Sequence, residues 1–191
     1  MGTHLSISQA KLAGGLHVAQ TCGFIVLVTV CGFAQSSKPP AQADLPIRQT
    51  TQLEATKKEQ ADNEFGEAFA LVDLGTRKSL EASIPKFAEA RRLYSELGDK
   101  RSEAYTLNEI IYVYANLAEY AKALDYCNQA LPLFRSLHDI KGEATTLNHA
   151  GGIYLDQNDN SKALESFMRA LPLRRAAGDA VGEGVTLNNI G

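Results

Sequence analysis

The chain has 191 residues, of which 45% are hydrophobic and 21% are charged, so it is long enough to bury one or two hydrophobic cores. Its formal net charge of -3 leaves no excess of basic residues, which disfavours a nucleic-acid-binding protein. The four histidines and three cysteines show no zinc-site spacing, and we expect neither a metal nor a cofactor.

Residues 1–34 have the composition of an export signal. Lys11 is the only charged side chain in this stretch, and residues 21–34 read TCGFIVLVTVCGFA without a charge. Small residues at Gly32 and Ala34 then fit a signal-peptide cleavage site after Ala34. We therefore expect residues 1–34 to direct the chain to export, into the periplasm or the medium.

An uncleaved membrane anchor is the alternative reading of the same stretch. The uncharged run 21–34 is shorter than the roughly 20 apolar residues that a spanning helix needs. Extending it back to Leu12 reaches that length but includes His17. A lipid attachment at Cys31 is less favoured, because Val30 precedes it where a small residue is required. In each case the rest of the chain lies outside the cytoplasm and meets a membrane only through this segment.

Residues 35–52 are rich in Ser, Gln, Pro, Ala and Thr. Such a polar, proline-interrupted composition packs poorly and is typical of a spacer. We expect this segment to be a disordered linker.

A tandem repeat dominates the remainder of the chain. Segments 101–140 and 141–180 align without a gap and are identical at fifteen of 40 positions. Segment 181–191 begins a further copy and stops within its first helix. Segment 53–100 resembles the repeat well only in its second half, which predicts a degenerate helical pair that serves as an N-terminal repeat or cap.

Each copy is predicted to contain two amphipathic helices. In the second copy, Ala144, Leu147, Gly151 and Tyr154 recur at helical spacing in the first half, and the second half shows a similar stripe. Aspartates stand where they can cap the first helices, at Asp99, Asp139 and Asp179.

Three residues of the second helices need separate expectations. Pro132 and Pro172 recur at one position of the repeat and predict a tolerated bend, with a helix break as the alternative. Cys127 stands where neighbouring copies carry Phe87 and Phe167, so we expect a buried core residue.

Five residues of the second copy resemble the tetratricopeptide signature in both type and spacing: Gly151, Tyr154, Ala163, Phe167 and Ala170. The 40-residue period and the TLN wording resemble the kinesin-light-chain-like branch of tetratricopeptide proteins. This resemblance implies an all-α fold, a right-handed superhelix or α-α solenoid, which would follow the N-terminal signal or anchor and the linker.

In the family resembled, the first helix of each copy lines the concave side of the superhelix and binds a peptide. Solvent-facing positions of these helices are therefore the predicted peptide-binding groove: Tyr105, Asn108, Glu109, Tyr112, Asn116, Thr145, Asn148, His149, Asp156 and Asn188. Asn108, Asn148 and Asn188 recur at one position of successive copies, so each carboxamide could contact a peptide backbone or could bond between repeats. His149 is read as an ordinary surface residue of the groove.

These features predict a protein–protein interaction scaffold and not an enzyme. The chain has no phosphate-binding glycine loop, nucleophile elbow or paired His/Cys. We expect a protein or peptide partner of unknown identity and no nucleic acid.

Two alternatives arise because the chain ends at Gly191 without a polar cap, which a solenoid normally has. Exported bacterial proteins with similar repeats often carry a C-terminal caspase-like CHAT peptidase domain, so the chain could be the recognition arm of such a protein. The second alternative is a structural repeat that self-associates through its uncapped end.

Overall fold

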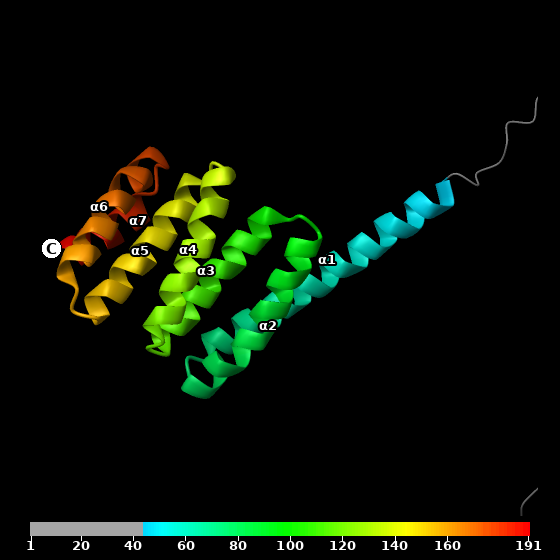
Figure 1. The fold of residues 1–191 in the computed structure, drawn as a ribbon, viewed down its shortest axis with the longest axis horizontal. Coiled ribbons are helices and arrows are strands. Elements are labelled where there is room, and N and C mark those ends of the chain that lie inside the picture. The colour runs from blue at the N-terminus through cyan, green and yellow to red at the C-terminus, as the bar shows by residue number, and fades with distance from the viewer. Residues whose placement is uncertain (1–43) are drawn as a thin grey trace, which may run out of the picture. The chain divides into compact units, whose positions relative to one another are not determined.

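The computed structural model describes residues 44–191, which form α-helices and no strand (Figure 1). The helices are α1 (Asp44–Asp73), α2 (Arg77–Glu96), α3 (Lys100–Asn116), α4 (Tyr120–Ser136), α5 (Ile140–Asp156), α6 (Asn160–Ala176) and α7 (Ala180–Ile190). The expected signal or anchor, its cleavage site at Ala34 and the first part of the linker lie outside the described residues. Within residues 44–191, no helix combines the length and the apolar composition that a membrane span requires.

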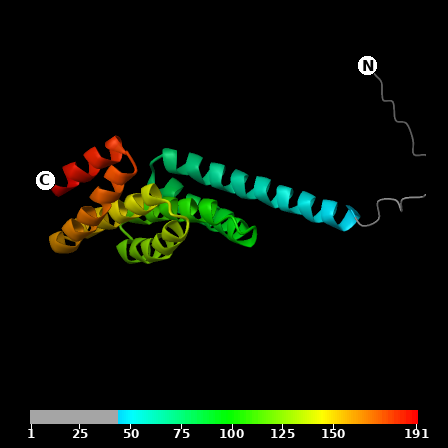
Figure 2. The same ribbon diagram turned by 90° about the horizontal axis from the view of Figure 1, so that it is seen from above.

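Consecutive helices form hairpins that stack side by side. α1 packs on α2, α3 on α4 and α5 on α6, and each hairpin packs on the next through α2 and α3, α4 and α5, and α6 and α7. The odd-numbered helices also contact one another in order, α1 with α3, α3 with α5 and α5 with α7 (Figures 1 and 2). The fold is therefore an all-α solenoid in which the first helix of every hairpin lies on one shared face.

The aspartates before α3, α5 and α7 cap these helices as expected. Their carboxylates accept hydrogen bonds from the backbone N–H of Ser102, Gly142 and Gly182 at 2.9–3.0 Å. Each bond satisfies one of the N–H groups that the first helical turn leaves without a partner, and such a cap stabilises a helix by about 1 kcal/mol. The caps fix where each first helix begins.

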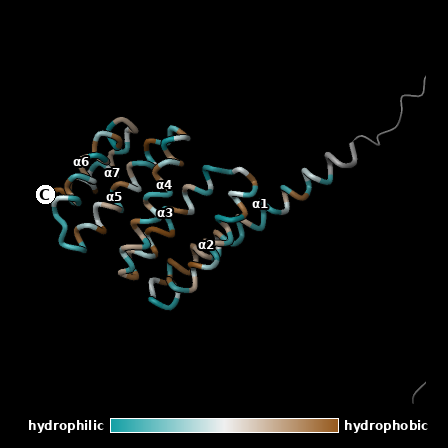
Figure 3. The backbone as a smooth tube through the Cα atoms, in the orientation of Figure 1, coloured by the Kyte–Doolittle hydropathy of each residue, from teal (hydrophilic) through white to brown (hydrophobic). Residues whose placement is uncertain are grey.

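The core lies where the helices meet, and hydrophilic and hydrophobic residues alternate along each of them (Figure 3). Phe87, Cys127 and Phe167 occupy equivalent positions of successive copies and are all buried. Burial raises the pKa of the Cys127 thiol to about 12, so this side chain is an unreactive part of the core, as expected.

Two core rings are accommodated by glycines on the following or facing helix. A Cβ atom on Gly151 of α5 would overlap the ring of Phe167, and one on Gly142 would overlap the ring of Phe134. In the preceding copy the volumes are exchanged, because Ile111 replaces Gly151 and Cys127 replaces Phe167. A larger side chain on the first helix is thus matched by a smaller one on the second, and the reverse holds in the next copy.

The helices continue through their prolines. Pro132 lies within α4 and Pro172 within α6, and both are exposed. An exposed ring on the outer side avoids the buried face of the helix, where its missing N–H would be more costly. The alternative of a helix break is therefore wrong.

The expected linker needs a correction, because α1 begins at Asp44 and so covers residues 44–52. Pro46 falls in the first turn of α1, where a proline removes no intrahelical hydrogen bond. The residues that follow are rich in Gln, Leu, Glu, Ala and Lys, which favour helices. The side chains of residues 49–56 are exposed, and this end of α1 extends beyond the stacked hairpins (Figure 2).

Candidate functional site

Two adjoining pockets form a groove on the face of the odd-numbered helices. One of about 250 Å³ is lined by α1, α3 and α5, and one of about 280 Å³ by α3, α5 and α7. Tyr112 and His149 line both pockets, so the two are continuous. We call this surface the groove, and its residues are Phe69, Val72, Asp73, Glu109, Tyr112, Ala115, Asn116, Asn148, His149, Gly152, Ile153, Leu155, Asp156 and Asn189.

The repeat explains why these side chains meet. Glu109, Tyr112 and Asn116 are spaced by three and four positions, so they lie along one face of α3. His149 occupies in α5 the repeat position that Glu109 occupies in α3, and Asn189 occupies it in α7, so one position contributes a groove residue from three successive first helices. Stacked repeats convert a sequence period into a row of side chains across the groove.

Six of the predicted residues are brought together in the groove: Glu109, Tyr112, Asn116, Asn148, His149 and Asp156. Asn188 is exposed on α7 and does not line either pocket. Thr145 is half-buried, and its hydroxyl donates to the carbonyl of Lys141 within its own helix, at 3.0 Å. Six of the ten predicted residues therefore line the two pockets, and Asn188 and Thr145 are among those that do not.

Tyr105 joins two repeats instead of lining the groove. Its hydroxyl donates to the Asp139 carboxylate at 2.9 Å, and its ring meets Phe134 edge-to-face with 5.3 Å between the centroids. It also lines a separate pocket with residues of α1 and α2, including Phe65 and Tyr94. Burial, and next the bond to Asp139, raise the pKa of the Tyr105 hydroxyl.

The asparagine ladder bonds between repeats. Asn108 is buried, and its carboxamide oxygen accepts a hydrogen bond of 2.7 Å from the Thr146 hydroxyl on the next first helix. Asn148 accepts in the same way from Thr186, at 3.2 Å, and also from the Asn189 amide at 3.4 Å. Of the two roles considered for the ladder, these bonds support the stacking of repeats; only Asn148 also lines the groove.

Two ionisable groups of the groove are desolvated. Glu109 is half-buried and makes neither a hydrogen bond nor an ion pair within residues 44–191, and burial raises the pKa of its carboxyl. Burial, together with the nearby Arg174 guanidinium, lowers the pKa of His149 to about 4. His149 is thus a half-buried neutral ring beside Tyr112, with 6.4 Å between the centroids, and not the ordinary surface residue that was expected.

The C-terminal end of α1 contributes a wall that was not predicted: Phe69, Val72 and Asp73. These residues were not predicted as part of the groove, because the first half of segment 53–100 shows little identity to the repeat. The 40-residue period alone would have pointed to two of them, because Phe69 and Val72 stand one full period before the groove residues Glu109 and Tyr112.

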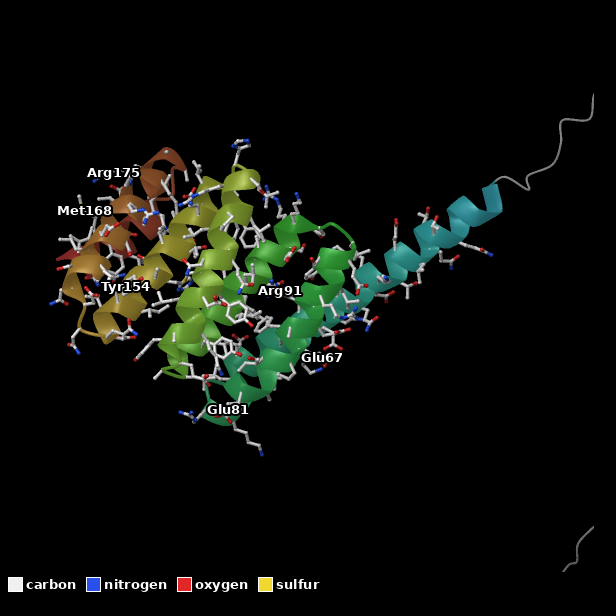
Figure 4. The ribbon with its side chains drawn as sticks, in the orientation of Figure 1. Glu67, Glu81, Arg91, Tyr154, Met168 and Arg175 are labelled. Carbon is white, nitrogen blue, oxygen red and sulfur yellow. The ribbon has the colours of Figure 1, made fainter. Side chains whose placement is uncertain are left out.

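A larger hollow of about 500 Å³ between α2 and α3 has a different character. Its charged groups already pair, Arg91 with Glu103 at 3.7 Å and Arg92 with Glu89 and Glu96. Arg91 lies among α2, α3 and α4 and also faces the ring of Tyr126, 5.9 Å from its centroid (Figure 4). Because its charges are satisfied internally, this hollow is a weaker candidate for a binding site than the groove.

Within residues 44–191, no group of His, Cys, Asp and Glu side chains is arranged to hold a metal ion. The groove instead presents aromatic and aliphatic surface, carboxamides and carboxylates. Those groups suit the recognition of another chain by burial and hydrogen bonding.

Comparisons with known proteins agree with this arrangement. The sequence model of a family described as tetratricopeptide repeat matches residues 102–176. No curated protein matches the chain. Among solved structures, the N-terminal domain of stress-induced protein-1 (STI-1) from C. elegans is similar with a TM-score of 0.54 and 22% identity, over 71% of this chain and 98% of that one. At this identity the likeness concerns the fold alone. The family model identifies residues 102–176 as tetratricopeptide repeats.

Proposed function

We propose that this chain is a protein-interaction scaffold that binds an extended peptide segment of a partner protein in the groove. Tetratricopeptide repeats support a role in protein interaction in general. The observation that carries the narrower proposal is the continuity of the two pockets through Tyr112 and His149, across four first helices.

The dimensions of the groove favour a chain-like ligand over a small molecule. Each pocket, at about 250–280 Å³, is smaller than the ~300–1,000 Å³ typical of small-molecule sites. Two shallow pockets in a row instead suit two side chains of one extended segment.

Large apolar side chains are exposed along the groove, as in the anchor sites of protein interfaces. Phe69 is 44% exposed, Tyr112 42% and Leu155 39%. Aromatic residues at the centre of an interface contribute a large share of binding energy when a partner covers them. Tyr112, which both pockets share, is the central member of this set.

Selection from an unbiased library of displayed 12-residue peptides against the full chain tests the proposal. We expect the selected peptides to lose at least about tenfold in affinity against Tyr112→Ala, because truncation removes the shared wall of both pockets. Met168→Ala is the matched control: Met168 is an exposed apolar residue of α6 outside the groove (Figure 4). Peptides that bind wild type and Tyr112→Ala equally, with both proteins folded by circular dichroism, would exclude the groove as the binding site.

A further inference from the structure

The charged residues that line the groove are all acidic. They are Asp73 on α1, Glu109 on α3 and Asp156 on α5, and neither pocket is lined by a lysine or an arginine. Within residues 44–191, none of these three carboxylates makes an ion pair or a side-chain hydrogen bond. The groove therefore carries negative charge that the described part of the chain does not neutralise.

Carboxylates elsewhere on the surface are mostly paired. Glu67 pairs with Lys86 at 2.5 Å and Glu81 with Arg77 at 3.0 Å, while Arg175 pairs with Glu183 at 2.7 Å (Figure 4). The chain thus has enough basic residues to pair many of its acids, and these residues lie outside the groove. The unpaired acids of the groove are not a consequence of a shortage of cations.

Glu109 is the most informative of the three carboxylates. It is half-buried between the helices, so it has lost part of its hydration without gaining an internal partner. Such a carboxylate is destabilised in its charged form, and a cation brought by a ligand would relieve this cost. The equivalent positions on the other first helices carry Phe69, His149 and Asn189, so the acid is not required by the packing of the repeat.

The surroundings of Glu109 also suit the stem of a basic side chain. Phe69, Val72 and Tyr112 line the same pocket. A lysine or arginine can bury its methylene groups against such apolar surface while its charged head meets the carboxylate, and an aromatic face adds a cation–π attraction.

Neighbouring groups do not place a competing positive charge in the pocket. His149 is neutral at neutral pH, because burial and Arg174 lower its pKa to about 4. Arg174 itself is buried and pairs with Asp179, the cap of α7. The charges that remain at the groove surface are those of Asp73, Glu109 and Asp156.

We infer that the partner segment is cationic and apolar, with a lysine or arginine seated against Glu109 and an apolar side chain in the second pocket beside Ile153 and Leu155. This inference rests on the proposed function of the groove and names the chemistry of its ligand. Charge complementarity and exposed apolar walls together select this segment over an acidic one.

Three pools of 12-residue peptides with equal apolar content provide the test. The polar positions are filled only by Lys and Arg in the basic pool, only by Asp and Glu in the acidic pool, and only by Gln and Asn in the neutral pool. Fluorescence anisotropy measures their binding to the full chain at low and at physiological salt. We expect the basic pool to bind at least about tenfold more tightly than the acidic pool, with a difference that shrinks as salt screens the charges.

Variants then locate the effect. Glu109→Gln should weaken binding of the basic pool by about tenfold, the loss of one charge-assisted contact, and should leave the neutral pool within about twofold. Asp125→Asn is the matched control, because Asp125 is an exposed acid on α4 that makes no ion pair within residues 44–191 and lies outside the groove.

The outcomes separate the two proposals. Tyr112-dependent binding of the acidic or neutral pool at equal or higher affinity would overturn the charge inference and leave the groove function standing. Absence of Tyr112-dependent binding by any pool or library peptide would overturn both. Self-association that Tyr112→Ala abolishes, measured by sedimentation, would identify a second copy as the occupant and also overturn the inference.

Discussion

The hydroxyl of Thr146 on α5 donates a 2.7 Å hydrogen bond to the carboxamide oxygen of Asn108 on α3, and both side chains are buried. The same relationship recurs one repeat later between Thr186 and Asn148. It is absent one repeat earlier, because Ala68 stands where the ladder would place an asparagine. A buried polar pair of this kind favours one register of a first helix against the next, because sliding either helix would leave the Asn108 carboxamide oxygen without this donor, whereas the Thr146 hydroxyl would keep its bond to the Gly142 carbonyl.

Removing this bond should destabilise the solenoid. We expect Asn108→Ala to lower the free energy of unfolding by about 1–3 kcal/mol, because a buried hydrogen bond and the packing of the carboxamide are lost. Asn188→Ala is the internal control and should change it by less than ~0.5 kcal/mol, since Asn188 is exposed. Urea unfolding measures both variants, and a double-mutant cycle with Thr146→Val isolates the pair. Equal stabilities of the two alanine variants would show that the bond does not matter.

Substitution by alanine should change the stability of the fold in opposite directions at two adjacent glycines of α5. Gly151→Ala should destabilise the fold by about 1–3 kcal/mol, because the new Cβ would overlap the Phe167 ring and force the core to shift. Gly152→Ala should stabilise it by about 0.5–1 kcal/mol, because no atom lies within 4 Å of its Cβ position and alanine favours the helix. Thermal unfolding of the two variants compares the effects directly; the same sign for both would contradict this account of the core.

Turns between helices contain residues whose backbone suits glycine. Ala118 and His138 have φ of 59° and 52°, whereas the position equivalent to His138 is Gly98 in one neighbouring copy and Gly178 in the other. Ala118→Gly and His138→Gly should each stabilise the protein by about 0.5–1 kcal/mol, because relief of the left-handed conformation exceeds the added entropy of the unfolded chain. Asn158, with φ of 60°, tolerates this region better, so Asn158→Gly should have a smaller effect in the same denaturation assay. A larger gain at Asn158 than at Ala118 would contradict this reasoning.

Much of the fold follows from local rules that the sequence displays. Helix caps such as Asp139, the apolar stripes and the 40-residue period are each readable from neighbouring residues, and together they require stacked hairpins. The groove face also follows, because the period fixes which side of each first helix looks outward from the stack.

The burial of individual groove residues could not be read in this way. Asn108 and Glu109 are adjacent in sequence, and only the exact placement of α5 against α3 makes the first a buried structural group and the second a groove carboxylate. The extent of α1 was missed for a related reason, since its exposed N-terminal part forms a helix without the apolar stripe that would have predicted it.

The desolvated ring of His149 predicts a pH dependence whose sign is fixed by its pKa. Burial, aided by Arg174, lowers this pKa from 6.5 to about 4, so between these values the unfolded chain binds a proton that the folded chain does not. The destabilisation caused by His149 is therefore absent above pH 6.5, and the free energy of unfolding falls as the pH drops towards 4. Glu109 and Asp73 line the same pocket; burial raises the pKa of the Glu109 carboxyl, and its protonation at low pH would further disfavour His149⁺.

Comparison with His149→Gln separates this effect from the titration of the carboxylates. Wild type should lose roughly 1–3 kcal/mol more than the variant between pH 6.5 and 4, because each pKa unit corresponds to ~1.36 kcal/mol and a half-exposed ring is partly hydrated. Urea unfolding at a series of pH values measures the difference, and an NMR titration of the His149 ring gives the pKa directly. Parallel stability curves for the two proteins, with a His149 pKa near 6.5, would show that the ring stays hydrated in the groove. A steeper acid loss in wild type would establish that tight packing of α5 against its neighbours, and not the sequence around His149, sets the protonation state of the groove.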